Sequence, residues 1–155
     1  MGGADIEGLT SRLQAHDVVG LDTAIFIYHF EAHPRYLPLT TAALSGVAQG
    51  DRQGVTSVIT LMEVTVRPYQ LERPAVAQHY EALLSYFPHL VMVEVDRAVA
   101  RRAAALRARY RVRPADALQV AASLVHGATA FLTNDRRLAR LQPMIDVILL
   151  DDFLA

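Results

Sequence analysis

Residues 17–24 read DVVGLDTA, and this stretch decides the fold of the chain. Its apolar run is too short for a helix but has the length of a buried strand, and residues 25–28 after it can wind as an apolar helix. In an open parallel α/β sheet, ligands bind at the carboxyl ends of strands, where the chain turns into the next helix. Asp22 stands at that point. Because a carboxylate beside an apolar strand is costly to leave unpaired, Asp22 is either a functional group or the N-cap of the following helix.

The composition favours a single domain over residues 1–155. Of the 155 residues, 52% are hydrophobic, which is enough to bury one sizeable core. The chain has no cysteine, and this excludes disulfides, thiolate zinc sites and a cysteine nucleophile. No apolar run approaches the roughly 20 residues that span a bilayer, and the first residues lack the layout of a signal peptide. We therefore expect a soluble, cytoplasmic protein that does not enter a membrane.

The basic residues are unusual in kind and in position. All 15 of them are arginines, and seven fall between residues 97 and 113 with no acidic residue among them. The formal net charge of the whole chain is only -1, so it argues neither for nor against nucleic acid. The arginine segment has two interpretations that the sequence leaves open. It is a solvated helix face, or it follows an RNA phosphate backbone through Arg101, Arg102, Arg109 and Arg111.

Strands and helices alternate along the chain. Short apolar runs bounded by turn residues predict strands at 18–21, 54–57, 90–95, 128–132 and 147–150. Helical spacing and capping residues predict helices at 6–16, 25–33, 36–49, 58–67, 73–87, 97–110 and 114–126, with a short helix from residue 136. Such alternation is typical of a parallel sheet covered by helices on both faces. The first helix forms an amino-terminal extension over residues 1–16.

Four carboxylates share one position in this pattern. Each lies just after a strand or in the first turns of a helix, where strand ends and helix starts converge on one edge of the sheet; they are Asp22, Glu63, Asp116 and Asp135. Four anions this close are tolerated only if some are protonated or if a multivalent cation lies among them. Oxygen ligands are the preference of Mg²⁺ and Mn²⁺, which also bind the phosphate oxygens of substrates.

Each carboxylate also has a purely structural interpretation. Asp116 favours a helix dipole, Asp135 can cap the short helix that follows it, and Glu63 can pair with Arg67 one turn later. Taken together these interpretations are weaker, because helix capping does not explain a glutamate inside an apolar helix.

Other kinds of site are poorly supported. His29 and His33 have the spacing of zinc ligands, but the H-E-x-x-H pattern is absent and no third ligand is evident. The chain has no G-x-x-x-x-G-K-[ST] loop, no G-x-G-x-x-G pattern and no G-x-S-x-G elbow. Nucleotide-binding loops and a serine hydrolase are therefore not indicated.

Four short motifs, in this order and spacing, resemble the PIN-domain ribonucleases, and especially the VapC-type toxins of toxin–antitoxin pairs. The motifs are GLDTA at 20–24, TLMEV at 60–64, RPADALQVAA at 113–122 and FLTND at 131–135. The resemblance runs from about residue 18 to the end. It implies a three-layer α/β/α domain whose five-stranded parallel sheet has the strand order 3-2-1-4-5.

The resemblance also implies an activity, which is hydrolysis of RNA by an endoribonuclease that depends on Mg²⁺ or Mn²⁺. Asp22, Glu63, Asp116 and Asp135 would be catalytic, and the metal would be held by Asp22, Asp116 and Asp135. Thr133, at a position that supports the site in the family, would assist together with Thr23 and Asn134.

For partners, the resemblance implies an RNA substrate, a cognate antitoxin protein and a homodimer. One departure is the helix before the first strand, since many such toxins begin almost at that strand. Two alternatives remain, namely a DNA or flap nuclease of related fold, and a degenerate PIN domain that serves only as an interaction module.

Overall fold

A parallel five-stranded sheet forms the centre of the computed structural model, which describes residues 3–155. The strands lie in the order β3-β2-β1-β4-β5, as predicted, and all of the pairs are parallel. β1 is central, and its Gly20 is paired with Val55 of β2 and Phe131 of β4. The strands are β1 (Val18–Leu21), β2 (Gln53–Ser57), β3 (Leu90–Val93), β4 (Ala130–Thr133) and β5 (Asp146–Leu149).

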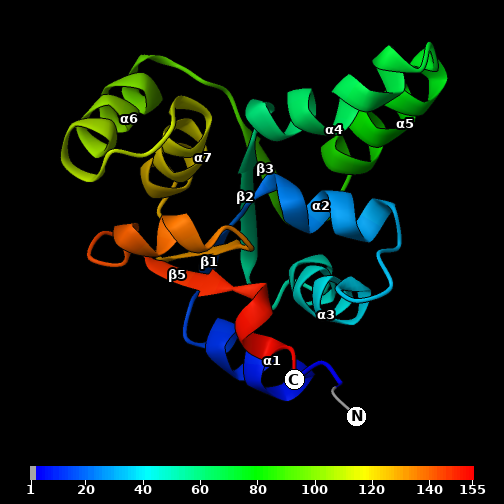
Figure 1. Cartoon of the computed structure of the whole chain (residues 1–155), viewed down its shortest axis with the longest axis horizontal. Helices are drawn as coiled ribbons and strands as arrows, with labels where there is room; N and C mark the ends of the chain where they lie inside the picture. The colour runs from blue at the N-terminus through cyan, green and yellow to red at the C-terminus, as the bar shows by residue number, and fades with distance from the viewer. Residues whose placement is uncertain (1–2) are drawn as a thin grey trace.

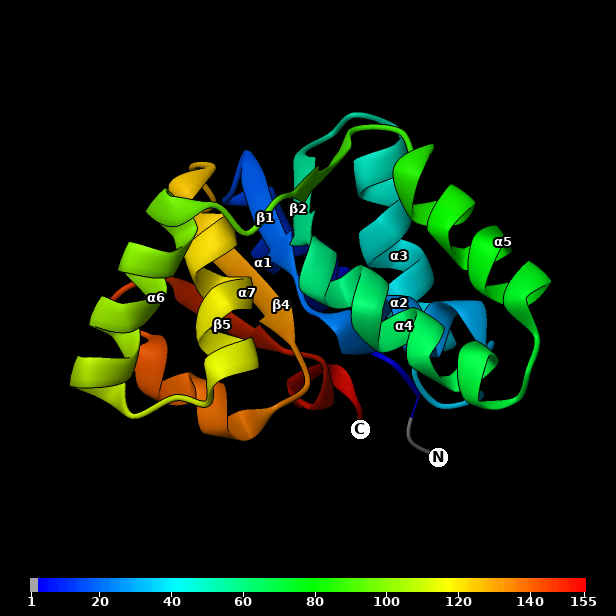
Figure 2. The same ribbon diagram turned by 90° about the horizontal axis from the view of Figure 1, so that it is seen from above.

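Helices cover both faces of this sheet (Figures 1 and 2). One face is covered by α1 (Ile6–Gln14), α2 (Thr23–Phe30), α3 (Leu37–Ala48), α4 (Val58–Gln70) and α5 (Pro74–Ser85). The other face is covered by α6 (Arg97–Tyr110), α7 (Pro114–Val125) and the 3-10 helix η1 (Arg136–Leu141). A second 3-10 helix, η2 (Leu150–Phe153), follows β5. The three-layer α/β/α architecture expected from the sequence is thus confirmed.

Successive side chains of a strand point to opposite faces of the sheet, so the buried residues form two separate cores. Leu21 and Leu132 point to the core shared with α2 and α3, whereas Phe131 points to the core beneath α6 and α7. Gly20 allows α7 to lie close to β1, because a Cβ there would be 2.2 Å from Oγ of Ser123 and 2.7 Å from Cδ1 of Phe131.

Helix α4 is longer than the sequence predicts. A stop near Pro68 was expected, yet the helix ends at Gln70 and includes this proline. A proline inside a helix lacks the N–H bond and crowds the carbonyl four residues earlier. The turn around Pro68 is nevertheless closed by Leu71, whose N–H donates to the carbonyl of Arg67 at 3.0 Å. Pro68 is itself buried, so packing offsets the lost hydrogen bond.

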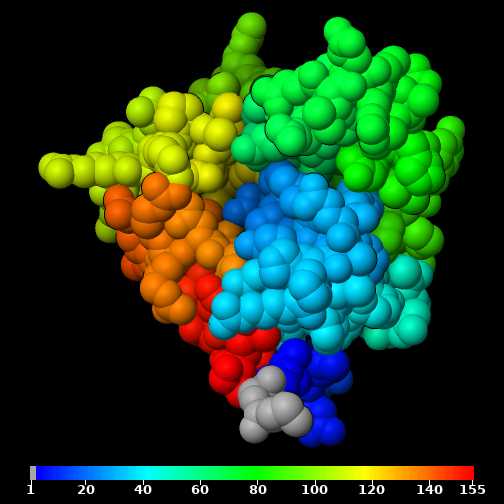
Figure 3. All heavy atoms as spheres, turned by 45° about the vertical axis from the view of Figure 1, so that its right-hand side comes forward, coloured from blue at the N-terminus to red at the C-terminus, as the bar shows by residue number. Residues whose placement is uncertain are grey.

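The amino-terminal helix is present and tied to the carboxyl-terminal end of the chain. Leu9 and Leu13 of α1 are buried in the first core. The N–H of Asp5 donates to the carbonyl of Phe153 at 2.7 Å, and Figure 3 shows the blue and red ends of the chain side by side. Residues 1–2 of the expected extension lie outside the described residues. Within the described part of the chain, every helix is too short or too polar to cross a membrane.

Candidate active site

Asp22 lies at the carboxyl end of β1, and hydrogen bonds from Thr23 and Thr133 hold its carboxylate. One carboxylate oxygen accepts a hydrogen bond from the N–H of Thr23 at 2.9 Å, so Asp22 is the N-cap of α2, as the structural interpretation predicts. The other oxygen accepts from the hydroxyl of Thr133 at 2.7 Å. Thr133 is fully buried at the end of β4, the neighbouring strand. Two strand ends therefore fix the orientation of this carboxylate.

Glu63 reaches the same place from the second turn of α4. Its carboxylate accepts a hydrogen bond from the hydroxyl of Thr23 at 2.6 Å. Among the residues that the structure describes, Glu63 forms no ion pair with Arg67, the partner expected if its role were structural. Thr23 thus joins the two carboxylates, since its N–H binds Asp22 and its hydroxyl binds Glu63.

Asp116 and Asp135 are engaged by arginines. Asp116 lies in the first turn of α7, with Oδ2 at 3.5 Å from Nε of Arg113. Asp135 follows β4 and caps η1, and both of its oxygens are bound by the guanidinium of Arg137, at 2.9 and 2.7 Å. Arg113 also lies 3.7 Å from Asp135, so one guanidinium bridges the two carboxylates.

The electrostatics of the site couple these carboxylates. Burial raises the pKa of Asp22, and the nearby charge of Glu63 raises it further, while the hydrogen bonds from Thr133 and Thr23 act in the opposite direction. The pKa of Asp116 is raised by burial and then by the charges of Asp22 and Asp135, and Arg113 opposes this. The structure thus brings the four predicted carboxylates into one electrostatic neighbourhood.

A buried polar network lies beneath the carboxylates, and the sequence reasoning missed its centre, Gln119. The amide nitrogen of this side chain lies 2.7 Å from the hydroxyl of Thr60, 3.1 Å from that of Thr23 and 3.4 Å from Oδ1 of Asp22. Its amide oxygen accepts from the hydroxyl of Ser57. Gln119 is 3% exposed, and an amide among the small apolar residues of α7 was the signal that could have revealed it.

A small basic cavity adjoins Asp116. Its volume is about 200 Å³, and four of its lining residues are arginines: Arg111, Arg113, Arg137 and Arg140. Of the arginines proposed to contact RNA, only Arg111 lines it; Arg101, Arg102 and Arg109 are exposed on α6.

Asn134, the remaining predicted supporting residue, links other elements. Its amide nitrogen donates to the hydroxyl of Tyr28 at 3.3 Å, and its oxygen accepts from the N–H of Asp151 at 3.0 Å. It therefore connects the end of β4 to α2 and η2 and makes no hydrogen bond to the four carboxylates.

The four carboxylates of the site are chemically suited to bind a divalent cation. The pKa values of Asp22 and Asp116 are raised by burial and by neighbouring carboxylates, a repulsion that a bound cation relieves, and all-oxygen ligands fit Mg²⁺ or Mn²⁺. As the side chains lie, however, no three histidine, aspartate or glutamate side chains within residues 3–155 are close enough to hold one ion. Arg113 and Arg137 supply the positive charge instead, and they would have to release Asp116 and Asp135 before these carboxylates could act as ligands.

Comparison with known proteins gives a family and a fold. The family model of the PIN domain matches residues 19–142. A search of curated protein sequences finds no significant match. One similar solved structure is a toxin–antitoxin complex from Klebsiella pneumoniae, with 23% sequence identity and a TM-score of 0.65 over 85% of this chain and 97% of that chain. Another is VapBC2 from Rickettsia felis bound to a promoter DNA fragment, with 17% identity and a TM-score of 0.66 over 84% of this chain and 96% of that chain. FitAcB from Neisseria gonorrhoeae is also similar, with 19% identity and a TM-score of 0.63 over 85% of this chain and 97% of that chain.

Proposed function

Because the chain belongs to the PIN-domain family, we propose that it is an endoribonuclease that uses Mg²⁺ or Mn²⁺ and acts as the toxin of a toxin–antitoxin pair. The observation that carries this proposal is the convergence of Asp22, Glu63 and Asp116 at one sheet edge, over the network of Gln119. A capping role alone requires neither a glutamate on Thr23 nor an amide beneath Asp22.

Each residue of the site would have its own role in the reaction. Asp22, Asp116 and Asp135 would hold the divalent cation. When bound, such a cation lowers the pKa of water and neutralises the phosphodiester. Glu63 would orient the attacking water, and Thr133 holds Asp22 in place through its hydroxyl. Hydrolysis would leave a 5′-phosphate and a 3′-hydroxyl.

The basic cavity suggests where the substrate backbone binds. Arg111 and Arg140 lie beside Asp116 and carry charges that a phosphate backbone can engage. We therefore include Arg111 in the RNA-binding surface. Arg101, Arg102 and Arg109 stay predictions, and an unchanged salt dependence of RNA binding in a variant that lacks these three would assign them to the solvated face.

The antitoxin partner is supported by two further observations. Arg113 and Arg137 show that guanidinium groups satisfy Asp116 and Asp135, so an arginine of a partner could do the same at Asp22. Helix α4 also leaves large apolar side chains exposed, as a protein-binding surface does: Met62, Val66 and Tyr69. A homodimer and a cytoplasmic location are part of the proposal, and sedimentation of the purified chain tests the first.

The decisive experiment measures cleavage of structured RNA, single-stranded RNA and flap DNA with Mn²⁺, with Mg²⁺ and with EDTA. We expect RNA cleavage that EDTA abolishes and that Asp22→Asn reduces at least about a hundredfold. Asparagine caps a helix as well as aspartate does, so this variant removes the charge and keeps the cap.

Asp96→Asn is the matched control, because Asp96 caps α6 through the N–H of Val99 at 2.9 Å and lies outside the site. If both variants cleave RNA like the parent, Asp22 is only a cap and the proposal is wrong. Cleavage of flap DNA alone would select the DNA nuclease, and metal-independent RNA binding without cleavage would select the interaction module.

A further inference from the structure

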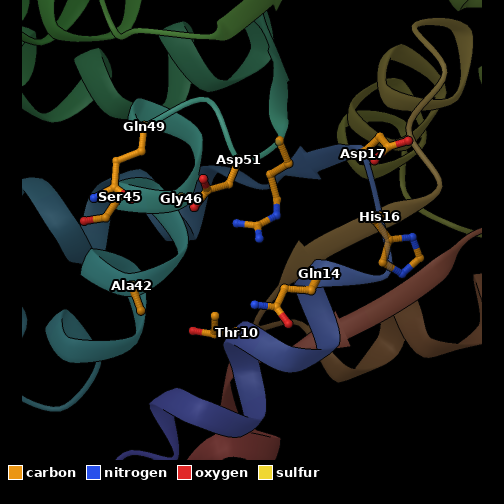
Figure 4. Close-up of a pocket in the computed structure, with 10 residues that line it drawn as sticks. Thr10, Gln14, His16, Asp17, Ala42, Ser45, Gly46, Gln49 and Asp51 are labelled. Carbon is orange, nitrogen blue, oxygen red and sulfur yellow. The ribbon is translucent and has the colours of Figure 1, made fainter.

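A larger cavity lies at the opposite edge of the sheet from the acidic site. Its volume is about 450 Å³, and it is lined by residues of α1, α3 and the turns that precede β1 and β2, at the amino ends of these strands. Figure 4 shows Thr10 and Gln14 of α1 facing Ala42 and Ser45 of α3 across it. The volume lies in the range of small-molecule sites, about 300–1,000 Å³.

The unusual member of the lining is Arg52, the residue before β2. It is only 7% exposed. Within residues 3–155 its guanidinium forms no ion pair, and its buried Nε–H has no hydrogen-bond acceptor. A buried cation without a partner is costly, and proteins normally pair such groups. Arg52 is therefore the charged group of this lining with which an anionic ligand would pair.

The guanidinium is placed by the backbone of α3. A Cβ atom at Gly46 would lie 2.1 Å from Nη1 of Arg52, so the glycine leaves the space that the guanidinium occupies. Gly46 belongs to the last turn of α3, and the negative end of the helix dipole attracts a cation there. This attraction makes the burial tolerable but gives the Nε–H no acceptor.

Charge varies along the depth of the cavity. Arg52 is buried, whereas the two acidic lining residues, Asp17 and Asp51, are exposed to solvent. Thr10 and Ser45, which also line the cavity and carry hydroxyl groups, are partly exposed. A ligand that fits this arrangement has an anionic group at its buried end and hydrogen-bond donors at its outer end.

We propose that this cavity binds a small polar molecule through an oxyanion, a carboxylate or a phosphate, that pairs with the guanidinium of Arg52. Such pairing can be bidentate, through two N–H groups of the guanidinium. The outer donors of the ligand would face Asp17 and Asp51. This site is separate from the acidic cluster, and it stands whether or not the chain cleaves RNA.

The test follows the Nε–H signal of Arg52 in nitrogen–proton NMR spectra of the full chain. Sodium phosphate and sodium acetate are titrated against sodium chloride at matched ionic strength, and thermal unfolding is measured under the same conditions. Arg52→Lys, which keeps the charge and lacks an Nε–H, identifies the signal by its absence. Arg97→Gln removes an exposed arginine of α6 and serves as the control.

We expect a saturable shift of the Arg52 signal with phosphate, with acetate or with both, together with a rise in melting temperature that chloride does not produce. A response to phosphate alone identifies a phosphoryl ligand, and a response to acetate alone identifies a carboxylate ligand. Arg97→Gln should retain the response, and Arg52→Gln should bind at least about tenfold more weakly.

Gly46→Ala provides a second variant that keeps the arginine. Its new methyl group displaces the guanidinium, so the Arg52 signal should move and the anion response should weaken. The proposal is overturned if neither anion shifts the Arg52 signal of the parent beyond the effect of chloride. It is also overturned if Arg52→Gln and the parent gain the same stability from phosphate and from acetate.

Discussion

Gln119→Glu replaces the buried amide beneath Asp22 by a carboxylate. The amide nitrogen lies 3.4 Å from Oδ1 of Asp22 and 2.7 Å from the hydroxyl of Thr60, and Gln119 is 3% exposed, so the substitution adds a further buried negative charge beside Asp22. Burial and the like charge both raise the pKa of the introduced group above its ordinary value of about 4.3.

The magnitude follows from linkage between protonation and folding. A pKa raised by about 2–3 units in the folded state lowers the free energy of unfolding by about 2.5–3.5 kcal/mol at pH 7. The loss is absent below about pH 4.3, where the group is protonated in both states, and it grows as the pH rises towards the folded pKa. It is a large share of a typical stability of about 5–15 kcal/mol.

Urea unfolding of parent and variant between pH 4.5 and pH 7.5 measures this difference. Gln78→Glu, at an exposed position of α5, is the matched control and should differ from the parent by less than about 0.5 kcal/mol throughout. A deficit of Gln119→Glu that is equal at both ends of the pH range would refute the coupling of Gln119 to Asp22.

Three more perturbations test other parts of the structure. Asp146→Asn should cost about 1–2 kcal/mol at pH 7 in urea unfolding, because Arg12 lowers the pKa of Asp146; the deficit should shrink below pH 3.8, and a constant deficit would contradict this. Gly20→Ala should lower stability by about 1–3 kcal/mol through contact with Ser123, whereas an unchanged unfolding midpoint would show that α7 moves away freely. Arg113→Gln should gain more thermal stability from Mn²⁺ than the parent does, and an equal gain would mean that this arginine does not compete with the cation.

The strands and most helices were predictable because local patterns decide them. The run before Asp22 is short and apolar, a polar residue follows each of β1 and β4, and the last residue of β2, Ser57, caps α4. Where tertiary packing decides, the prediction fails. Pro68 is an example, since it stays inside α4 because its ring is buried, which sequence spacing does not reveal.

The acidic residues of the candidate site were predictable, but their partners were not. Asp22 and Asp116 follow from their place after a strand and at a helix start. Arg113 and Asp116 have i,i+3 spacing, but the contact of Arg113 with Asp135 depends on how the turn before α7 is oriented, and no spacing rule predicts it. The burial of Arg52 could not be predicted from the sequence either, because it depends on Gly46, which belongs to another element.

The hydrogen bond from Thr133 to Asp22 also has a consequence for the newly made chain. It joins residues 111 positions apart, and β1 pairs with β4 only when that late strand has been synthesised. Such long-range pairing forms slowly, because the loop must close before the contact can stabilise it. A ribosome that has not yet passed residue 133 therefore carries an Asp22 without its hydroxyl donor. The carboxylate acquires its support only after residue 133 has been synthesised.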